Sequence, residues 1–490
     1  MADRIWIGAD LGTQSVKVVA VDDGGRVHGR GSQPLTGARS GERHEQDPEQ
    51  WWTAFATAAR GATAGLDATR IGGIAACGTS GTILLADAAG RPLTPGLMYD
   101  DARAAAEALR VNEIGEADWN RLGYRRMQAG WALPKLLWLL GHGGAAAGAR
   151  LLHQTDVITW RLAGRQVAAD ASHALKTGYD LLEEDWPWEV LDRLGIPAGL
   201  MPEVARPGTV LGEVDPAGAE ATGIPAGTPI VAGMTDGCAA QLAGGALGTG
   251  SWNSVLGTTL VLKGVSDRIV RDPAGVVYCH RGPGGTWLPG GASSSGAGAL
   301  SRRWPAADLD ELTARASRRA PEQVVYPLAS ERGERFPFTA ADLEPFQIGD
   351  AADDVDVFHG VLIGLACVER LCFDHLDHIG APTGGDLAFT GGGAANRYWS
   401  QLRVDLLGRP AALPEHAESA VGMAVLAATT AGRSAAEAAA SMVRTGARLE
   451  PDRARHELLS DLYLRFADHL HDTGRIDRPL HAHVHRRAEH

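Results

Sequence analysis

Cysteine is scarce in this chain, and the few cysteines lie far apart. The 490 residues include Cys77, Cys238, Cys279, Cys367 and Cys372, an odd number without a C-x-x-C pair. A disulfide framework needs paired cysteines, and a zinc site built on cysteine needs closely spaced ones. The sequence therefore argues against both, and we expect reduced, mostly buried thiols.

Long apolar runs and an excess of positive charge are also missing. No stretch reaches the ~18 uninterrupted apolar residues of a membrane span, and the first residues do not resemble a secretion signal. The 46 lysines and arginines are outnumbered by 59 aspartates and glutamates, and the net charge of −13 repels nucleic acid and anionic membranes. We expect a cytoplasmic protein without nucleic-acid or membrane partners, in which phosphate recognition is local.

The chain does contain enough apolar sequence for more than one core. Single cores stop growing at roughly 250–300 residues, so this length predicts two or three domains. Helix-like and strand-like segments alternate, which is typical of an α/β fold. A strand, Gly-Thr turn and strand in residues 5–22 recurs in residues 254–265. We predict an N-terminal lobe over 1–247, a C-terminal lobe over 248–450, and a C-terminal helix with a histidine-rich tail over 451–490.

The first candidate site lies in the stretch IWIGADLGTQS. Asp10 ends an apolar strand, and Gly12, Thr13 and Gln14 form the turn that follows. Oriented backbone amides in such a turn bind anions such as phosphate. A carboxylate beside phosphate suits Mg²⁺, which is held by one or two carboxylates with phosphate oxygens and water. The alternative is a hairpin turn in which Asp10 caps its own backbone.

A second turn of the same kind, LGTT, contains Gly257 and Thr258 and starts the second lobe. Two such turns can hold one polyphosphate from both sides, whereas a single turn cannot. The repeat therefore favours the phosphate-binding interpretation of both.

A third glycine-rich segment, TGGGAANRYW, connects a strand to a helix. Gly392 and Gly393 allow close approach to a flat or anionic ligand at the start of the helix. Asn396 is a candidate hydrogen-bonding partner for a base or ribose, and Trp399 a candidate stacking surface. Burial of Trp399 in a core is the alternative, because aromatic residues dominate cores.

A second carboxylate, Asp236, follows another apolar strand in VAGMTDGCAAQ. A positioned aspartate can take the proton of a substrate hydroxyl, which is the role of a general base. The alternative is that Asp236 caps the helix that starts at Gly237.

Together these motifs resemble the FGGY family of carbohydrate kinases over about residues 4–430. The segments that carry the resemblance are DLGTQS, EQDPEQWW, MYDDARA, GMTDG, LGTT, FTGGGAANRYW and ESAVGMAVLAA, in the family's order. The resemblance implies the actin-like ATPase architecture of the sugar kinase/Hsp70 superfamily, with two RNase H-like lobes around a nucleotide cleft. It also implies ATP and Mg²⁺ as cofactors, Asp236 as catalytic base, and Asp10 as neighbour of the metal and the sugar.

The loop CGTSGT bears on the choice of sugar. Xylulokinases commonly carry Met-His-Gly where this chain has Ser80 and its neighbours, so a histidine facing the sugar is missing. This loop, together with SHALKTGYD and VYCHRGPGGTWLPGG, is similar to a D-ribulose kinase subgroup. The resemblance implies that Ser80, Asp10 and Asp236 bind the sugar and that D-ribulose becomes D-ribulose 5-phosphate.

Other functions remain as alternatives. D-xylulose, L-ribulose and polyols are open as substrates, and the resemblance leaves both a monomer and a homodimer open. An actin-like ATPase switch would keep the fold but hydrolyse ATP regardless of sugar, whereas a kinase needs its acceptor. A silent sugar or nucleotide sensor is disfavoured, because both aspartates and both turns are intact.

Two further segments are unusual in composition. Residues 469–490 hold six histidines at irregular spacing, and because termini are usually poorly ordered we expect no physiological metal site there. The segment LPKLLWLL is too short to span a bilayer and predicts a packed helix, with Lys135 facing the cleft or solvent.

Overall fold

The computed structural model describes residues 3–143 and 148–488, which divide into two compact units. Unit 1 comprises Met1–Gly245, Cys279–Leu288 and His416–Arg444, and unit 2 comprises Ala246–Tyr278, Pro289–Glu415 and Thr445–His490. The sequence-based division placed residues 279–288 and 416–444 in the second lobe and set 451–490 apart. The packing of residues 416–444, described below, explains the largest of these differences.

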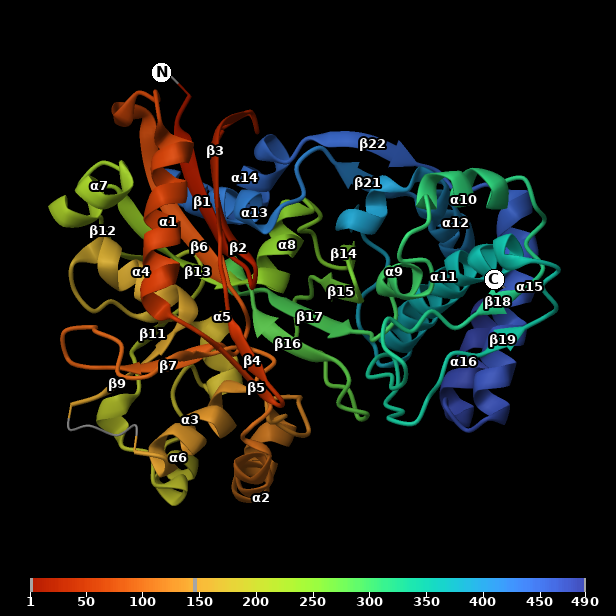
Figure 1. The fold of residues 1–490 in the computed structure, drawn as a ribbon, viewed down its shortest axis with the longest axis horizontal. Helices are drawn as coiled ribbons and strands as arrows, with labels where there is room; N and C mark the ends of the chain where they lie inside the picture. Colours follow the sequence, from red (N-terminus) through yellow and green to blue (C-terminus); the bar gives the residue numbers. More distant parts are fainter. Residues whose placement is uncertain (1–2, 144–147, 489–490) are drawn as a thin grey trace. The chain divides into compact units, whose positions relative to one another are not determined.

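Unit 1 is built on a six-stranded sheet in the order β12-β13-β6-β1-β2-β3 (Figure 1). Strands β1 and β2 form the predicted hairpin, β3 continues it in the antiparallel sense, and β6 and β13 run parallel to β1. This arrangement is that of an RNase H-like sheet. The strands are β1 (Ile5–Leu11), β2 (Ser15–Asp22), β3 (Val27–Pro34), β6 (Ile71–Gly78), β12 (Val210–Glu213) and β13 (Pro229–Thr235).

Alternation along β1 directs its side chains to two different helical layers. Ile5, Ile7, Ala9 and Leu11 enter a core that contains Trp51 and other residues of α1 (Pro48–Thr63). The opposite face of β1 lies against α13 (Ser419–Ala427), which also packs on α8 (Asp236–Ala243). Asp10 therefore belongs to the face that α13 covers.

Small residues make the contact between β1 and α13 very close. A Cβ atom at Gly8 would lie 1.8 Å from the backbone oxygen of Ala420, and one at Gly422 would lie 2.0 Å from that of Ala239. A side chain larger than hydrogen at Gly8 would push α13 away from the sheet, and one at Gly422 would push it away from α8. Residues 416–444 thus belong to unit 1 because α13 completes its layered core.

Unit 2 repeats the topology of unit 1. The sheet that contains most of its strands has the order β16-β17-β15-β14-β20-β21-β22, in which β14 pairs antiparallel with β15 and parallel with β20. The duplication inferred from the two Gly-Thr turns is therefore present in the fold. The strands are β14 (Trp252–Leu256), β15 (Leu260–Gly264), β16 (Tyr278–Arg281), β17 (Trp287–Ala292), β20 (Leu387–Thr390), β21 (Ala411–Pro414) and β22 (Thr445–Leu449). Most of β16 and the start of β17 fall in the segment Cys279–Leu288, which belongs to unit 1.

The remaining elements cover these sheets or form small sheets of their own. Further helices of unit 1 are α2 (Ala105–Arg121), α3 (Ala132–Gly141), α4 (Gln154–Ala163), α5 (Ala171–Ala174), α6 (Trp188–Leu194), α7 (Pro216–Thr222) and α14 (Ala435–Met442). Helices of unit 2 are α9 (Gly298–Arg303), α10 (Leu309–Ala316), α11 (Asp354–His378), α12 (Arg397–Leu407), α15 (Arg453–Asp472) and α16 (Arg478–Ala488). The small sheets contain β4 (Ala38–Ser40), β5 (Arg43–Gln46), β7 (Ile83–Ala86), β8 (Gly96–Leu97) and β9 (Arg150–His153), then β10 (Ala169–Asp170) with β11 (Val204–Ala205), and β18 (Val324–Val325) with β19 (Gln347–Ile348).

Two expectations about buried residues have different outcomes. All five cysteines are free and buried, as predicted. The expectation that Lys135 faces a cleft or solvent is wrong, because its side chain is fully buried on α3 and donates hydrogen bonds to the carbonyls of Leu97 and Met98. Burial lowers the pKa of Lys135 to about 7, so the surrounding core favours its neutral form.

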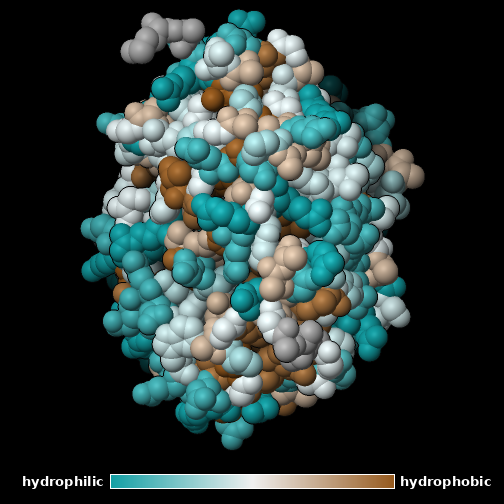
Figure 2. Space-filling view, turned by 90° about the vertical axis from the view of Figure 1, so that its left-hand side faces the viewer, coloured by the Kyte–Doolittle hydropathy of each residue, from teal (hydrophilic) through white to brown (hydrophobic). Residues whose placement is uncertain are grey.

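The surface is polar with scattered apolar side chains. Figure 2 shows hydrophilic residues over most of one face, with hydrophobic ones in small groups between them. Among the described residues, no helix combines the length and the apolar character needed to cross a membrane.

Candidate functional site

Three parallel strands of unit 1 end at the same edge of the sheet. Asp10 at the end of β1 pairs in register with Cys77 on β6, and Gly78 pairs with Thr235 at the end of β13. Asp236 follows Thr235 as the first residue of α8. The carboxyl ends of parallel strands are the usual ligand-binding edge of open α/β sheets. The structure thus places both predicted carboxylates at one edge.

The carboxyl group of Asp10 is partly buried and close enough to Asp236 to interact with it electrostatically. Burial, followed by repulsion from Asp236, raises the pKa of Asp10 from 3.8 to about 6, while the Cys77 thiol and Lys17 oppose the rise. A buried negative charge without a cation is costly, and two neighbouring carboxylates increase the cost. This edge is therefore suited to a divalent cation, which would remove both penalties.

Cys77 contributes a proton donor to the carboxylate. Its Sγ lies 3.5 Å from Oδ1 of Asp10 and 3.4 Å from the backbone oxygen of Ala9. Burial and then the charges of Asp10 and Asp236 raise the pKa of Cys77 well above its ordinary value. The thiol therefore stays protonated beside Asp10, and it is a hydrogen-bond donor rather than a nucleophile.

Asp236 is held at the positive end of a helix. Its Oδ1 accepts the backbone N–H of Gly237 at 2.7 Å, and its backbone oxygen accepts the Ser419 hydroxyl of α13 at 3.3 Å. A helix N-terminus favours a negative charge, so the carboxylate form of Asp236 is stabilised there. The alternative prediction is that Asp236 caps a helix starting at Gly237. In the structure Thr235 is the N-cap and Asp236 is the first residue of the helix.

Ser80 lies in the loop after β6, two residues beyond the end of this strand at Gly78. Among the described residues, no group hydrogen-bonds to the buried Ser80 hydroxyl. The backbone oxygen of Ser80 accepts the Lys176 ammonium at 3.0 Å, and this ammonium lies 5.7 Å from the centre of the Trp131 ring. Because buried hydroxyl groups are normally paired, the unpaired Ser80 hydroxyl points to a polar ligand.

In the turn between β1 and β2, the N–H of Gly12 donates to the carbonyl of Ser15 at 3.0 Å, and two other carbonyls of the turn are anchored by residues outside it. The carbonyl of Thr13 accepts the side-chain amide of Gln46 at 2.7 Å, and the carbonyl of Gln14 accepts the N–H of Leu35 at 2.8 Å. In a trans peptide the N–H points away from the C=O, so anchoring these carbonyls directs the N–H groups of Gln14 and Ser15 the other way. The turn is arranged as an anion-binding turn needs to be.

The turn between β14 and β15 in unit 2 is held in the same manner. The carbonyl of Gly257 accepts the N–H of Ala297 at 3.1 Å, and that of Thr258 accepts the N–H of Gly298 at 3.0 Å. The N–H groups of Thr258 and Thr259 therefore point away from these anchors. Each unit thus carries one Gly-Thr turn with outward amides.

The glycine-rich segment after β20 lies against β14. A Cβ atom at Gly393 would come within 2.5 Å of the Leu256 side chain, whereas one at Gly392 would meet nothing within 4 Å. Asn396 caps α12 by accepting the N–H of Trp399 at 2.9 Å, and it donates to the Thr313 hydroxyl at 2.9 Å. Gly392 is therefore the open position of the segment, and Asn396 holds the start of α12.

The proposed stacking role of Trp399 is wrong. Its ring is 2% exposed, and its indole N–H donates to the carbonyl of Leu362 at 2.9 Å. The ring is therefore part of the core of unit 2, as is common for aromatic side chains.

We expect Trp399→Phe to change stability rather than nucleotide affinity. The substitution removes the hydrogen bond to Leu362 and leaves a small cavity, which together cost about 1–3 kcal/mol. Thermal unfolding should show the loss, while the KM for ATP should change less than about twofold. A large rise in the KM for ATP at unchanged stability would return Trp399 to the nucleotide site.

Some residues at the site escaped the sequence argument. Tyr99, in the segment MYDDARA, hydrogen-bonds with the side chain of Thr13, and burial followed by Asp100 and Asp236 raises its pKa. Glu418, next to α13, adds to the negative charge acting on Asp10. Lys176 and Trp131 come from segments whose sequence signals only helices or loops. Three of these residues do lie in family-like segments: Tyr99 in MYDDARA, Glu418 in ESAVG and Lys176 in SHALKTGYD. The sequence does not show that they lie near Asp10, Asp236 or Ser80, because that depends on the packing of distant segments.

Comparisons with known proteins agree with this geometry. Residues 5–243 match the N-terminal domain of the FGGY family of carbohydrate kinases, and residues 252–431 match its C-terminal domain. The chain is 32% identical over 452 residues to a xylulose kinase of Streptomyces coelicolor, covering 89% of this chain and 90% of the relative. It is 30% identical over 439 residues to an autoinducer-2 kinase of Escherichia coli, covering 81% and 80%.

Solved structures share the fold over nearly the whole chain. A structure from Brucella ovis described as a xyloylose kinase has a TM-score of 0.88 at 25% identity and covers 97% of this chain and 100% of its own. A Plasmodium falciparum glycerol kinase with ADP has a TM-score of 0.82 at 16% identity, covering 95% and 98%. The chain belongs to the FGGY family of carbohydrate kinases.

Proposed function

We propose that this enzyme transfers the γ-phosphoryl group of ATP to a ketopentose and prefers D-ribulose to D-xylulose. One observation supports the proposal most directly. Asp10 and Asp236 lie at the carboxyl ends of neighbouring strands of unit 1, and the unpaired Ser80 hydroxyl lies in the loop that follows the strand between them. A base, a site for a cation and a polar contact for a sugar are the parts that phosphoryl transfer to a hydroxyl requires.

In this proposal Asp236 accepts the proton of the attacking sugar hydroxyl, whose oxygen then forms the new bond to the γ-phosphorus as the bond to ADP breaks. Asp236 lies at a helix N-terminus, which favours negative charge, and so is placed to act as a base. The amides of the turn containing Gly12, Thr13 and Gln14, and of the turn containing Gly257 and Thr258, hold phosphate oxygens. Gly392 and Gly393 admit the adenosine.

Mg²⁺ fits the oxygen donors at this edge, and Asp10 is the residue that would hold it, directly or through water. When bound, Mg²⁺ neutralises charge on the phosphates and on the partly buried carboxylate. The raised pKa of Asp10 has burial and then repulsion from Asp236 as its main causes, and a bound cation would offset both.

The preference for D-ribulose rests on Ser80. D-Ribulose and D-xylulose differ only in the configuration at C3, so the group that faces this hydroxyl decides between them. A short serine offers a hydrogen bond where a histidine would fill space, and the neighbouring Gly81 has a φ of +101°, which fixes the loop in a conformation favourable to glycine. D-Xylulose is the second candidate, supported by the xylulose kinase relatives.

Coupled measurement of ADP release with Mg·ATP tests the proposal. D-Ribulose, D-xylulose, L-ribulose, L-xylulose, ribitol and glycerol are compared with a control without sugar. We expect D-ribulose to give the highest kcat/KM, by at least about tenfold, because a site built to hydrogen-bond one hydroxyl discriminates strongly against its misplacement. Faster turnover of D-xylulose would contradict the preference, and ADP release independent of sugar would contradict the kinase role.

Ser80→Ala should raise the KM for the preferred sugar about tenfold, the effect of one lost hydrogen bond of ~1.4 kcal/mol. Ser317→Ala is the matched control, because this exposed serine donates to the Ala314 carbonyl of its own helix. An unchanged KM for Ser80→Ala would remove Ser80 from the sugar site.

A further inference from the structure

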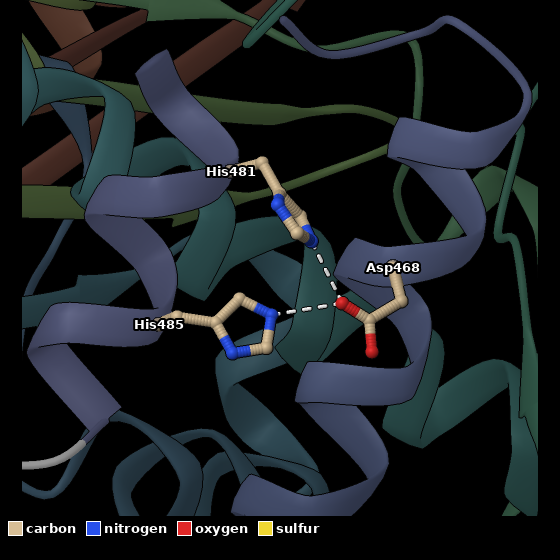
Figure 3. A group of neighbouring side chains, drawn as sticks. All are labelled: Asp468, His481 and His485. Atoms are coloured by element: carbon tan, nitrogen blue, oxygen red, sulfur yellow. Dashed lines mark hydrogen bonds and ion pairs between the residues drawn. The ribbon is translucent and has the colours of Figure 1, made fainter. Parts of the chain in front are cut away.

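The C-terminal histidines are ordered in two packed helices of unit 2, contrary to the expectation of a poorly ordered end. Helix α15 carries Asp468, and α16 carries His481 and His485. Figure 3 shows both imidazole rings turned from α16 toward the carboxylate on α15. His490 lies outside the described residues.

The three side chains converge on one point. Nε2 of His481 lies 2.7 Å and Nε2 of His485 lies 2.8 Å from the same oxygen, Oδ1 of Asp468. His481 and His485 are four residues apart, so successive turns of α16 place them on one face. Among the described residues, this is the group of three metal-ligating side chains whose donor atoms all lie within 4.8 Å of one another.

The spacing of the donors is close to that of a metal site. Ligands about 2.0–2.1 Å from a tetrahedral ion lie ~3.3 Å apart, so the imidazole nitrogens need to move from the carboxylate by about half an ångström. The side chains are 23% (His481), 39% (His485) and 47% (Asp468) exposed, which leaves room for rotation and for water as a further ligand.

A third imidazole lies beside the group. The ring of His471 on α15 stacks on that of His481 with centroids 4.3 Å apart. Its Nδ1 is 3.3 Å from the carbonyl of Ile476, a weak contact that a rotation of the ring can exchange for another partner. The stacked ring of His471 therefore borders the cluster and supports the orientation of His481.

The two imidazole rings face the same oxygen of the Asp468 carboxylate, so the three candidate ligands already point to one place. Two hydrogen bonds currently satisfy Oδ1 of Asp468. A metal ion would take the place of these two shared protons.

We propose that Asp468, His481 and His485 bind a divalent transition-metal ion, Zn²⁺ in the first instance, which links α15 to α16. Two imidazoles and one carboxylate suit Zn²⁺, Co²⁺ and Ni²⁺, whereas Mg²⁺ prefers oxygen ligands alone. None of these three residues is among those assigned to phosphoryl transfer, and the role of the metal site is to stabilise the C-terminal helix pair.

Isothermal titration of the full chain without an affinity tag, using Zn²⁺ alone and Co²⁺ as spectroscopic probe, tests the site. We expect one ion per chain and a Co²⁺ absorption spectrum typical of nitrogen and oxygen ligands. His481→Ala and His485→Ala should each weaken binding at least ~10-fold, because even the loss of outer-sphere partners costs 10–100-fold. Asp468→Asn, which retains the shape of the side chain, should do the same.

His483→Ala is the matched control. His483 lies between the two proposed ligands on α16 but contacts Asp377 on α11 at 3.0 Å instead. Its substitution should leave Zn²⁺ affinity within about twofold of the parent, whereas an equal loss in all histidine variants would show nonspecific binding and overturn the site.

Stability and activity separate the metal site from the kinase site. Saturating Zn²⁺ should raise the unfolding temperature of the parent and of His483→Ala, but not that of His481→Ala. Turnover with Mg·ATP should be the same in all three proteins without Zn²⁺. Weak binding that persists unchanged in the double variant His481→Ala/His485→Ala would mean that hydrogen bonding alone accounts for the cluster.

Discussion

Asp236→Asn should lower kcat by about 10³-fold while leaving the KM values for sugar and ATP within about threefold of the parent. A general base contributes about 10²–10⁴-fold, and the amide cannot accept the proton of the sugar hydroxyl. The amide oxygen can still accept the N–H of Gly237, so α8 keeps its start. Single-turnover phosphorylation and nucleotide titration separate chemistry from binding.

A second readout follows from the charge of Asp236. Repulsion from this residue contributes to the raised pKa of Asp10, so its removal should lower that pKa. In Asp236→Asn, the loss of stability that accompanies ionisation of Asp10 should therefore occur at lower pH than in the parent. A purely steric defect would not produce this shift. Asp192→Asn, at an exposed position on α6, is the matched control and should leave both measurements unchanged. Substantial sugar phosphorylation by Asp236→Asn would refute the role as base.

Asp10→Asn should stabilise unit 1 and impair catalysis. The pKa of Asp10 is raised from 3.8 to about 6, so the folded state binds this proton more tightly than the unfolded state. Stability from this group is present below about pH 4 and is lost as pH rises through about 6. At pH 7–8 without ligands, removing the charge should recover on the order of 3 kcal/mol. The unfolding temperature should rise by roughly 5 °C.

The catalytic cost of Asp10→Asn should be about 10²-fold or more in kcat, since the charge opposite the cation is lost. In the parent enzyme, kcat/KM should fall on the acid side with an apparent pKa near 6 that belongs to the coupled pair Asp10 and Asp236. The stabilisation should vanish at pH 4, where Asp10 is protonated.

A substitution of opposite sign provides the control for Asp10→Asn. A hydrogen bond with Arg319 lowers the pKa of Asp353 to about 2, so Asp353→Asn should lower the unfolding temperature at neutral pH. Equal effects of both substitutions would contradict the electrostatic explanation, as would a gain for Asp10→Asn that persists at pH 4.

The strand ends and turns of the site could be predicted from the sequence, whereas the packing around them could not. Asp10 and Asp236 could be predicted because each follows an apolar strand, and strand ends of a parallel sheet meet at one edge. The recurrence of a strand, Gly-Thr turn and strand in residues 254–265 is likewise present, as β14 and β15. Such strand, turn and helix patterns are set by residues close in the sequence, so they are predictable without knowledge of tertiary contacts.

The residues that the sequence misplaced depend on contacts between distant segments. Trp399 and Lys135 are buried because other elements cover them, and neither fact is encoded in the spacing around them. Asp468 joins two histidines because a turn reverses the chain between α15 and α16. Periodicity shows one face of a helix, but it does not show which partner that face meets.

The close packing of α13 on β1 has a consequence for biosynthesis. Because the backbone at Gly8 touches that of Ala420, the first sheet lacks its second covering layer until residues 419–427 have left the ribosome. At about 5–20 residues per second, translation of the intervening chain takes about 20–80 s. During that interval the apolar face of β1 and β6 is exposed in the nascent chain, which makes it a binding site for a chaperone and a target for aggregation.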